Sequence, residues 1–233
     1  MALGYRAALT AKTRTTLPVV VADTGDPVST GLVDNLARPS GHLTGVSDMT
    51  IELSPKRLQL LKELVPTLRR IAIIWNTADA GMVVRKQTSE AAARKLGMAI
   101  EPFGVREPDD IERAFEAMAR DKPDALLVIA EYLTIANRRR IYDFSDVHRL
   151  PVLYEENSVL IRDGGVMFYG PDEDESMDRV AALIDRILKG AKPQDLPFER
   201  PRLFKFVINA KTTKALGLEI PPSLRALADE VIE

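Results

Sequence analysis

The sequence predicts an α/β fold of doubly wound, mainly parallel sheets, and three features of the chain support this fold class. Segments with a strand-like period alternate with segments of helical period from one end of the chain to the other. Residues 71–75 and 125–129 are continuous apolar runs, which is typical of parallel strands covered on both faces. The apolar run of residues 17–22 stops abruptly at Asp23, where a polar loop containing Gly25 begins. Loops at the ends of such strands are where open α/β sheets bind ligands.

The predicted strands lie, in chain order, at residues 17–22, 43–47, 71–75, 99–103, 125–129, 151–154, 165–169 and 203–208. Amphipathic helices are predicted between them at residues 52–65, 85–96, 109–120 and 176–188. The first helix carries Pro55 early and stops before Pro66, and Gly97 follows the second. The last ends in a basic turn followed by Gly190. A further helix is predicted to begin near Pro27.

The composition is typical of a soluble globular protein, with 45% hydrophobic and 28% charged residues. A net charge of −2 gives no general attraction to phosphate backbones, so no nucleic-acid partner is predicted. The chain has no cysteine, and its two histidines, His42 and His148, lie far apart, so neither a metal site nor a cofactor is predicted. No stretch approaches the roughly 18 apolar residues of a membrane span, and residues 1–6 lack the apolar core of a signal peptide.

A set of short motifs points to a known family. They are Gly25-Asp26-Pro27-Val28, Gly31-Leu32-Val33, residues 36–41, Leu43-Thr44-Gly45-Val46-Ser47, residues 56–66, residues 186–193, Phe206-Val207-Ile208-Asn209, residues 214–218 and Ile220-Pro221-Pro222-Ser223-Leu224. Together they resemble the substrate-binding component of ABC importers, in the branch of tryptophan- and tyrosine-type binding proteins with the type I periplasmic-binding fold. The resemblance covers nearly the whole chain, and the motifs are specific as a set although each is weak alone.

The resemblance implies two α/β lobes, joined by hinge strands, that close around a ligand cleft. It assigns residues 1–50 and 160–192 to the first lobe and residues 51–159 and 200–233 to the second. Family members carry an export signal and further strand–helix units ahead of the strand at residues 17–23, so the first lobe is expected to be incomplete. That strand is then expected at an open sheet edge, where it favours self-association. The implied location is the periplasm, and the implied partners are ABC permease subunits and a small organic solute.

Ligand-binding residues are predicted in the loops that follow the strands, because the carboxyl ends of parallel strands meet at one edge of a sheet. The candidates are Thr24, Asp26, Asn76, Thr77, Asp79, Glu131 and Glu155. An acid such as Asp26 suits the ammonium of an amino-acid-like ligand, and a helix N-terminus suits its carboxylate. At residues 130–133 the sequence departs from the Ser or Asp-Asn element common in the family, which leaves the ligand's identity open.

Each of these candidates also has a purely structural interpretation. Asp26 can instead cap the helix expected near Pro27, and Asn76 and Asp79 can simply form turns. Glu155 can be an exposed surface residue. These alternatives stay open at the level of the sequence.

The function predicted from these observations is that of a non-enzymatic solute-binding component of an ABC importer. Its ligand is predicted to be small and amino-acid-like, and to be bound between two lobes. No Ser-His-Asp order, GxSxG motif or phosphate-binding glycine loop can be assembled from the chain, so no catalytic residue is predicted. Two alternatives remain: a cytoplasmic ligand-sensing domain related to repressor effector domains, and a small α/β enzyme that works with carboxylates.

Overall fold

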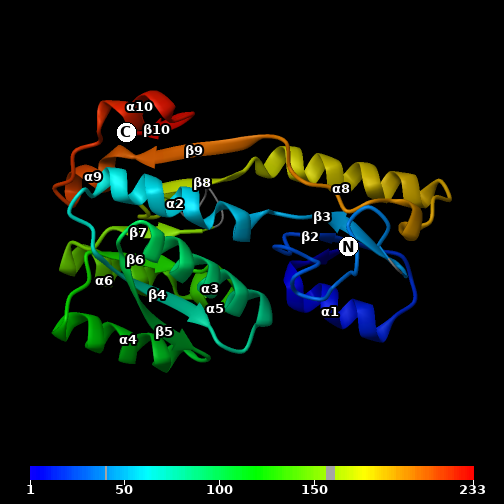
Figure 1. The fold of residues 1–233 in the computed structure, drawn as a ribbon, viewed down its shortest axis with the longest axis horizontal. Coiled ribbons are helices and arrows are strands. Elements are labelled where there is room, and N and C mark those ends of the chain that lie inside the picture. The colour runs from blue at the N-terminus through cyan, green and yellow to red at the C-terminus, as the bar shows by residue number, and fades with distance from the viewer. Residues whose placement is uncertain (40, 156–160) are drawn as a thin grey trace. The chain divides into compact units, whose positions relative to one another are not determined.

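The protein was analysed as a computed structural model that describes residues 1–39, 41–155 and 161–233 (Figure 1). The elements are β1 (Ala2–Leu3), α1 (Gly4–Arg14), β2 (Val19–Ala22), β3 (Leu43–Val46), α2 (Thr50–Leu64), β4 (Arg70–Asn76), α3 (Ala80–Lys95), β5 (Ala99–Val105), α4 (Pro108–Arg120), β6 (Ala125–Val128), α5 (Tyr132–Ala136), α6 (Arg138–His148), β7 (Val152–Tyr154), β8 (Met167–Pro171), α8 (Glu173–Leu188), the 3₁₀-helix η1 (Pro193–Asp195), β9 (Phe204–Asn209), α9 (Ala210–Ala215), α10 (Pro222–Leu227) and β10 (Glu230–Ile232). Strands and helices are interspersed along the whole chain, and the strands form mainly parallel sheets, which confirms the predicted α/β class.

The chain folds into two compact units. Unit 1 comprises Met1–Ile51 and Pro171–Phe204, and unit 2 comprises Glu52–Gly170 and Lys205–Glu233. The chain therefore passes from one unit to the other three times. Unit 1 has a three-stranded sheet and unit 2 a seven-stranded sheet. No helix within the described ranges is both long enough and apolar enough to cross a membrane.

Unit 1 is built around β2, whose side chains alternate between two small cores. Val19 and Val21 pack with Ala8 of α1, and Val20 and Ala22 pack with α8. The two helices therefore cover opposite faces of the sheet, as Figure 1 also shows. Because every side chain of β2 is covered, the strand reads as an uninterrupted apolar run.

Two expectations for this part of the chain are wrong. The strand at residues 17–23 is not at a sheet edge, because the order is β1-β2-β3 and β1 pairs with β2 at Val21 and Ala22. The two-residue strand β1 is too short to give a detectable sequence pattern. No helix begins near Pro27 either. Residues 27–31 form turns, with Gly31 in the left-handed region (φ 72°) and its N–H bonded to the carbonyl of Val28.

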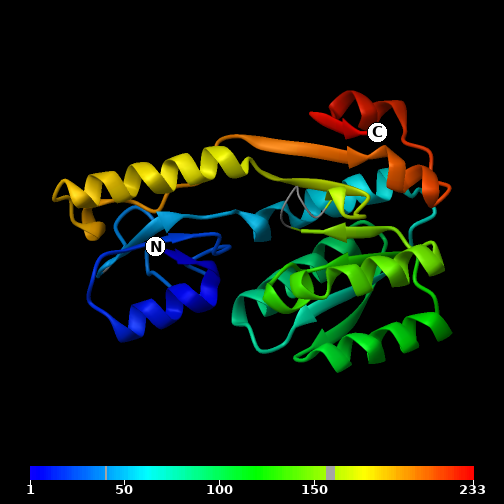
Figure 2. The same cartoon turned by 180° about the vertical axis from the view of Figure 1, so that it is seen from behind.

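Unit 2 contains the larger sheet, ordered β10-β9-β8-β7-β6-β4-β5. The pairs β4–β5, β4–β6, β6–β7, β7–β8 and β9–β10 are parallel. The β8–β9 pair runs antiparallel: the N–H of Asn209 bonds to the carbonyl of Val166, and the N–H of Asp172 bonds to the carbonyl of Leu203. The sheet is therefore mainly parallel, as predicted. Figure 2 shows the elements from the opposite side.

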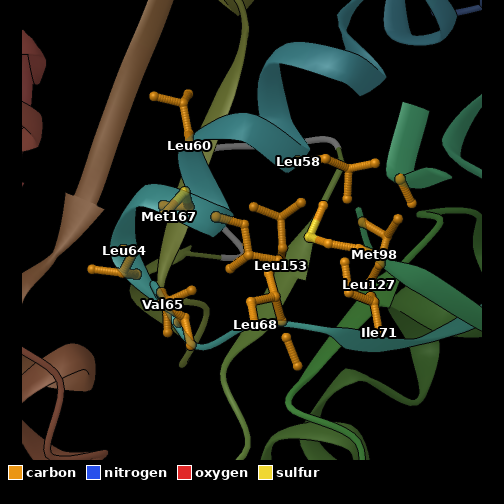
Figure 3. Close-up of a cluster of buried hydrophobic side chains, with 14 of the residues drawn as sticks. Leu58, Leu60, Leu64, Val65, Leu68, Ile71, Met98, Leu127, Leu153 and Met167 are labelled. Atoms are coloured by element: carbon orange, nitrogen blue, oxygen red, sulfur yellow. The ribbon is translucent and has the colours of Figure 1, made fainter. Parts of the chain in front are cut away.

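Successive residues of the central strands in unit 2 point into two different cores. The α3-side core takes Ile71, Ile73 and Leu127 together with side chains of α2 and α3 (Figure 3). The α4-side core takes Ile74 and Val128 together with side chains of α4 and α6. Helices therefore cover both faces of the sheet. This double covering explains why residues 71–75 of β4 and all of β6 are apolar and lack a two-residue alternation.

We expect Leu61→Ala to destabilise unit 2 by about 2–5 kcal/mol, because it removes a fully buried side chain and leaves a cavity between α2 and the sheet. Urea unfolding followed by the fluorescence of Trp75 measures this, since Trp75 is the chain's single tryptophan and lies on β4. The control is Gln59→Ala, an exposed position of the same helix, where a change within about 0.5 kcal/mol is expected. Equal effects of the two substitutions would contradict the described packing.

Candidate ligand-binding site

The order of strands in unit 2 reverses at β4. From β4 the chain passes through α3 to β5 on one side, and it then returns through α4 to β6 on the other side. Helix α3 follows β4 on the α3-side core, whereas α5, which follows β6, packs its Leu133 and Ile135 on the α4-side core. The loops after two adjacent strands therefore diverge to opposite faces of the sheet. Such a switch point is where open α/β sheets bind ligands.

Two of the predicted residues meet at this switch point. Asn76 ends β4, and its Nδ2 donates a hydrogen bond to Oε2 of Glu131, which follows β6, at 3.1 Å. Asn76 is 5% exposed, and its Oδ1 accepts the N–H of Ala78. Oε1 of Glu131 accepts the N–H of Thr134, so this carboxylate also caps α5. Each oxygen of Glu131 thus accepts one described hydrogen bond and can accept another from a ligand.

Thr77 and Asp79 lie beside this pair and have different contacts. Asp79 is buried, and its Oδ1 accepts the N–H of Gly81 at 2.8 Å as the N-cap of α3. Asp79 therefore caps a helix, where the structural alternative was a turn, and its carboxylate supports the loop. Oγ1 of Thr77 accepts a hydrogen bond from Nε of Arg106 at 2.8 Å. Arg106 follows β5, so its guanidinium is part of the same edge of the sheet.

Glu155, at the end of β7, is 1% exposed, so its interpretation as an exposed surface residue is wrong. Hydroxyl groups of two flanking helices face its Oε1: Ser54 of α2 at 3.5 Å and Ser89 of α3 at 3.4 Å. The described contacts of Glu155 are therefore with the helices of the α3-side core, while Glu131 contacts β4 and α5. The sequence predicts Glu131 and Glu155 at the same edge of the sheet, and in the structure the two carboxylates have different surroundings.

In unit 1 the loop after β2 contains the other two predicted residues. Oδ1 of Asp26 accepts the N–H of Val28 at 2.9 Å, so Asp26 caps a turn rather than the expected helix. Thr24 is 3% exposed, and its Oγ1 has no hydrogen-bond partner among the described residues. Oγ of Ser47, which follows β3, donates to the carbonyl of Gly25 at 2.6 Å and ties the two loops together. An unpaired buried hydroxyl at the carboxyl end of a strand is suited to contact a ligand.

The sequence interpretation missed Arg106, Ser54 and Ser89. The sequence held a signal for Arg106, because this residue directly follows a strand. The predicted strand ended at residue 103, however, so Arg106 was not counted among the residues at the strand end. The actual strand runs to Val105. Ser54 and Ser89 are single hydroxyl residues within helices, and nothing in a helical pattern separates them from ordinary polar positions. Only the packing of α2 and α3 reveals their contact with Glu155.

A family model described as ABC transporter substrate binding protein matches residues 4–232. The match spans almost the entire chain, so the protein belongs to this family. This confirms the resemblance identified from the sequence motifs.

Individual relatives are similar over most of this chain. A tyrosine-binding protein of Clostridioides difficile (strain R20291) is 24% identical over 204 residues, which are 87% of this chain and 58% of that protein. This chain therefore spans somewhat more than half the length of that relative. A solved ABC domain from Streptococcus pneumonia in complex with L-Trp is 27% identical, with a TM-score of 0.90 over 99% of this chain and 79% of that chain. A ligand-free, open substrate-binding protein of Clostridium difficile shares the fold at 23% identity and a TM-score of 0.71, covering 99% of this chain and 77% of that chain.

We expect Asn76→Asp to destabilise unit 2 at pH 7, because it replaces the donor facing Glu131 with a second carboxylate at about 3 Å. Urea unfolding monitored by the adjacent Trp75 provides the measurement.

The matched variant is the double substitution Asn76→Asp with Glu131→Gln, which places an amide opposite the new carboxylate and restores one hydrogen bond. We expect it to recover most of the stability lost at pH 7. If the double variant were as unstable as the sum of the two single substitutions, the Asn76–Glu131 interaction would not be energetically significant.

Proposed function

We propose that this protein is the solute-binding component of an ABC importer and that it binds a small amino-acid-like solute without transforming it. The observation that carries the proposal is the Asn76–Glu131 pair at the switch point of the unit 2 sheet. The pair presents a fixed amide and a carboxylate with remaining acceptor capacity, and this combination suits the ammonium group of such a ligand.

Thr24 and Asp26 of unit 1 are proposed as further ligand-contacting residues. Membership of the family supports the proposed class of ligand, as does the similarity to one protein named for tyrosine binding and to one domain solved with L-Trp. The proposed partners are ABC permease subunits, and the proposed location is the periplasm. Substrate-binding proteins of this family typically work outside the cytoplasm.

The family assignment favours the receptor over the two alternatives that the sequence leaves open. A repressor-type sensor would act through a DNA-binding element, and an enzyme would act through an acid, base or nucleophile aimed at its substrate. The polar contacts of the candidate residues instead hold loops: in unit 2 Asp79 caps α3 and Glu131 caps α5, and in unit 1 Asp26 caps a turn. Residues fixed in this way are suited to recognition by hydrogen bonding.

We expect L-tyrosine or L-tryptophan to bind the protein in isothermal titration calorimetry, and Glu131→Gln to weaken the binding by about 1–3 kcal/mol. The physical reason is that the substitution leaves a desolvated ammonium without its anionic acceptor. The control is Glu116→Gln, which makes the same charge change at an exposed position of α4. An equal effect of the two substitutions would remove Glu131 from the site, and the absence of binding by either amino acid would refute the proposed ligand class.

The bound solute is expected to be released unchanged. NMR spectra of L-tyrosine and L-tryptophan incubated with the protein for many hours should show the starting compounds alone. Product that forms with the protein and disappears with Glu131→Gln would overturn the receptor proposal and support the enzyme.

A further inference from the structure

We propose that the ring of Tyr132 packs against the side chain of the bound solute and makes the candidate site of unit 2 selective for solutes with an aromatic side chain. This inference rests on the proposed function, in which Glu131 binds the ammonium of the solute. It adds to that function a residue that recognises the side chain, and it concerns unit 2 alone.

The first observation is that the ring of Tyr132 is uncovered. Tyr132 is 88% exposed, and it is the one exposed aromatic residue among those that the structure describes. Other aromatic residues of unit 2 pair with each other: the rings of Phe115 and Phe144 stack with centroids 4.4 Å apart, and those of Tyr142 and Tyr154 lie 5.5 Å apart. A ligand that covers the ring of Tyr132 removes apolar surface from water, and this favours binding.

The second observation is that α5 is held in place without Tyr132. Leu133 and Ile135 pack on the α4-side core, and Thr134 is fully buried, with its Oγ1 donating to the carbonyl of Ile129 at 3.0 Å. Because successive residues of a helix lie about 100° apart around its axis, Tyr132 is left on the outer side. The backbone at Tyr132 is therefore fixed by its neighbours, and its ring is available to a ligand.

The third observation is that Tyr132 and Glu131 project from the same end of α5. Tyr132 is the first residue of the helix, and Cα–Cβ bonds in a helix tilt toward the N-terminus, so its side chain leans beyond that end. The carboxylate of Glu131 lies at this end as well, because its Oε1 accepts the N–H of Thr134 in the first turn. The Cα atoms of the two residues are about 3.8 Å apart. A ligand group bonded to Glu131 is therefore within reach of the ring.

An aromatic amino acid matches this pair of residues. Its ring is attached three bonds from its ammonium nitrogen, so the ring stays close to the acceptor that holds the nitrogen. With the ammonium on Glu131, the ligand's ring can pack on Tyr132 at the centroid separation of about 4.5–7 Å that aromatic pairs adopt. Two rings in this arrangement gain an electrostatic attraction that a ring and an aliphatic chain lack. Tyr132 should therefore distinguish solutes by their side chains.

The test is calorimetric titration with three amino acids that share the ammonium and carboxylate and differ in the side chain: L-tyrosine, L-tryptophan and L-leucine. Tyr132→Ala should weaken binding of the aromatic amino acids by about tenfold, because the contact between the rings is lost. It should weaken binding of L-leucine by about threefold or less. Tyr132→Phe keeps the ring and should retain the affinity for the aromatic amino acids within about twofold.

The matched control is Val147→Ala, which truncates another exposed apolar side chain of unit 2, near the C-terminal end of α6. Because α6 leads into the amino end of β7, and β7 is parallel to β6, this position lies at the opposite edge of the sheet from Glu131. The control should leave the affinity for each amino acid unchanged. Urea unfolding followed by Trp75 shows that each variant is folded before it is titrated.

The outcomes separate the inference from the proposed function. If neither aromatic amino acid binds the unsubstituted protein, the proposed ligand class fails and this inference fails with it. If one binds and Tyr132→Ala leaves its affinity unchanged, the inference is refuted and the proposed function stands. Equal losses for L-leucine and the aromatic amino acids also refute it, as do equal losses in Tyr132→Ala and Tyr132→Phe. If L-leucine does not bind at all, the comparison of these two variants decides alone.

Discussion

The pairing of β4 with β5 on one side and with β6 on the other is the constraint on which the rest of unit 2 depends. It places a continuous apolar strand at the point where the chain reverses its direction across the sheet. Because the crossover from β4 runs toward β5 and the crossover from β6 runs toward β7, in opposite directions across the sheet, right-handed connections place the following helices on opposite faces. The polar loops that follow β4 and β6 are therefore kept apart at the point where the strand order reverses. The same packing that buries Ile73 and Ile74 thus separates the loops that carry Asn76 and Glu131.

The polar residues at this place are organised by hydrogen bonds among the protein's own groups. The side chain of Asn76 accepts the N–H of Ala78 within its own loop and donates to Glu131 of the neighbouring loop. Glu131 in turn caps α5. Residues with these contacts have few alternative orientations, so binding costs little ordering of side chains. In unit 1 the loop after β2 is fixed differently. Asp23 adopts a left-handed backbone conformation with φ of 57°, and the hydroxyl of Ser47 ties the loop to β3. Backbone strain of this kind is often found at functional sites.

The elements that could be predicted are those whose burial leaves a pattern in the sequence. Strands β2 and β6 are buried along their whole length, β4 is buried over residues 71–74, and helices α4 and α8 have one buried face, so each was recognisable. Strands β1 and β10, of two and three residues, are too short to show a pattern. The helix expected near Pro27 fails because the side chain of Asp26 and the left-handed Gly31 hold the chain in turns instead.

The candidate site was predictable only in part, for a related physical reason. A residue's place after a buried strand can be read from the sequence, and this rule located Asn76 and Glu131 and would have located Arg106 had β5 been given its full length. The hydrogen-bond partners of such a side chain, and the depth to which it is buried, depend on helices from other parts of the chain that pack against it. Glu155 is buried because α2 and α3 cover it with Ser54 and Ser89, and no local pattern near residue 155 carries that information.

The measurement that tests the central claim most directly is hydrogen–deuterium exchange of the backbone amides with and without saturating L-tyrosine or L-tryptophan. The proposed site predicts slower exchange in the loops after β2, β4 and β6, around Thr24, Asn76 and Glu131, and little change in the outward-facing turns of α4. Protection confined to other segments, with these three loops unaffected, would contradict the proposal that the loops at the strand ends hold the solute.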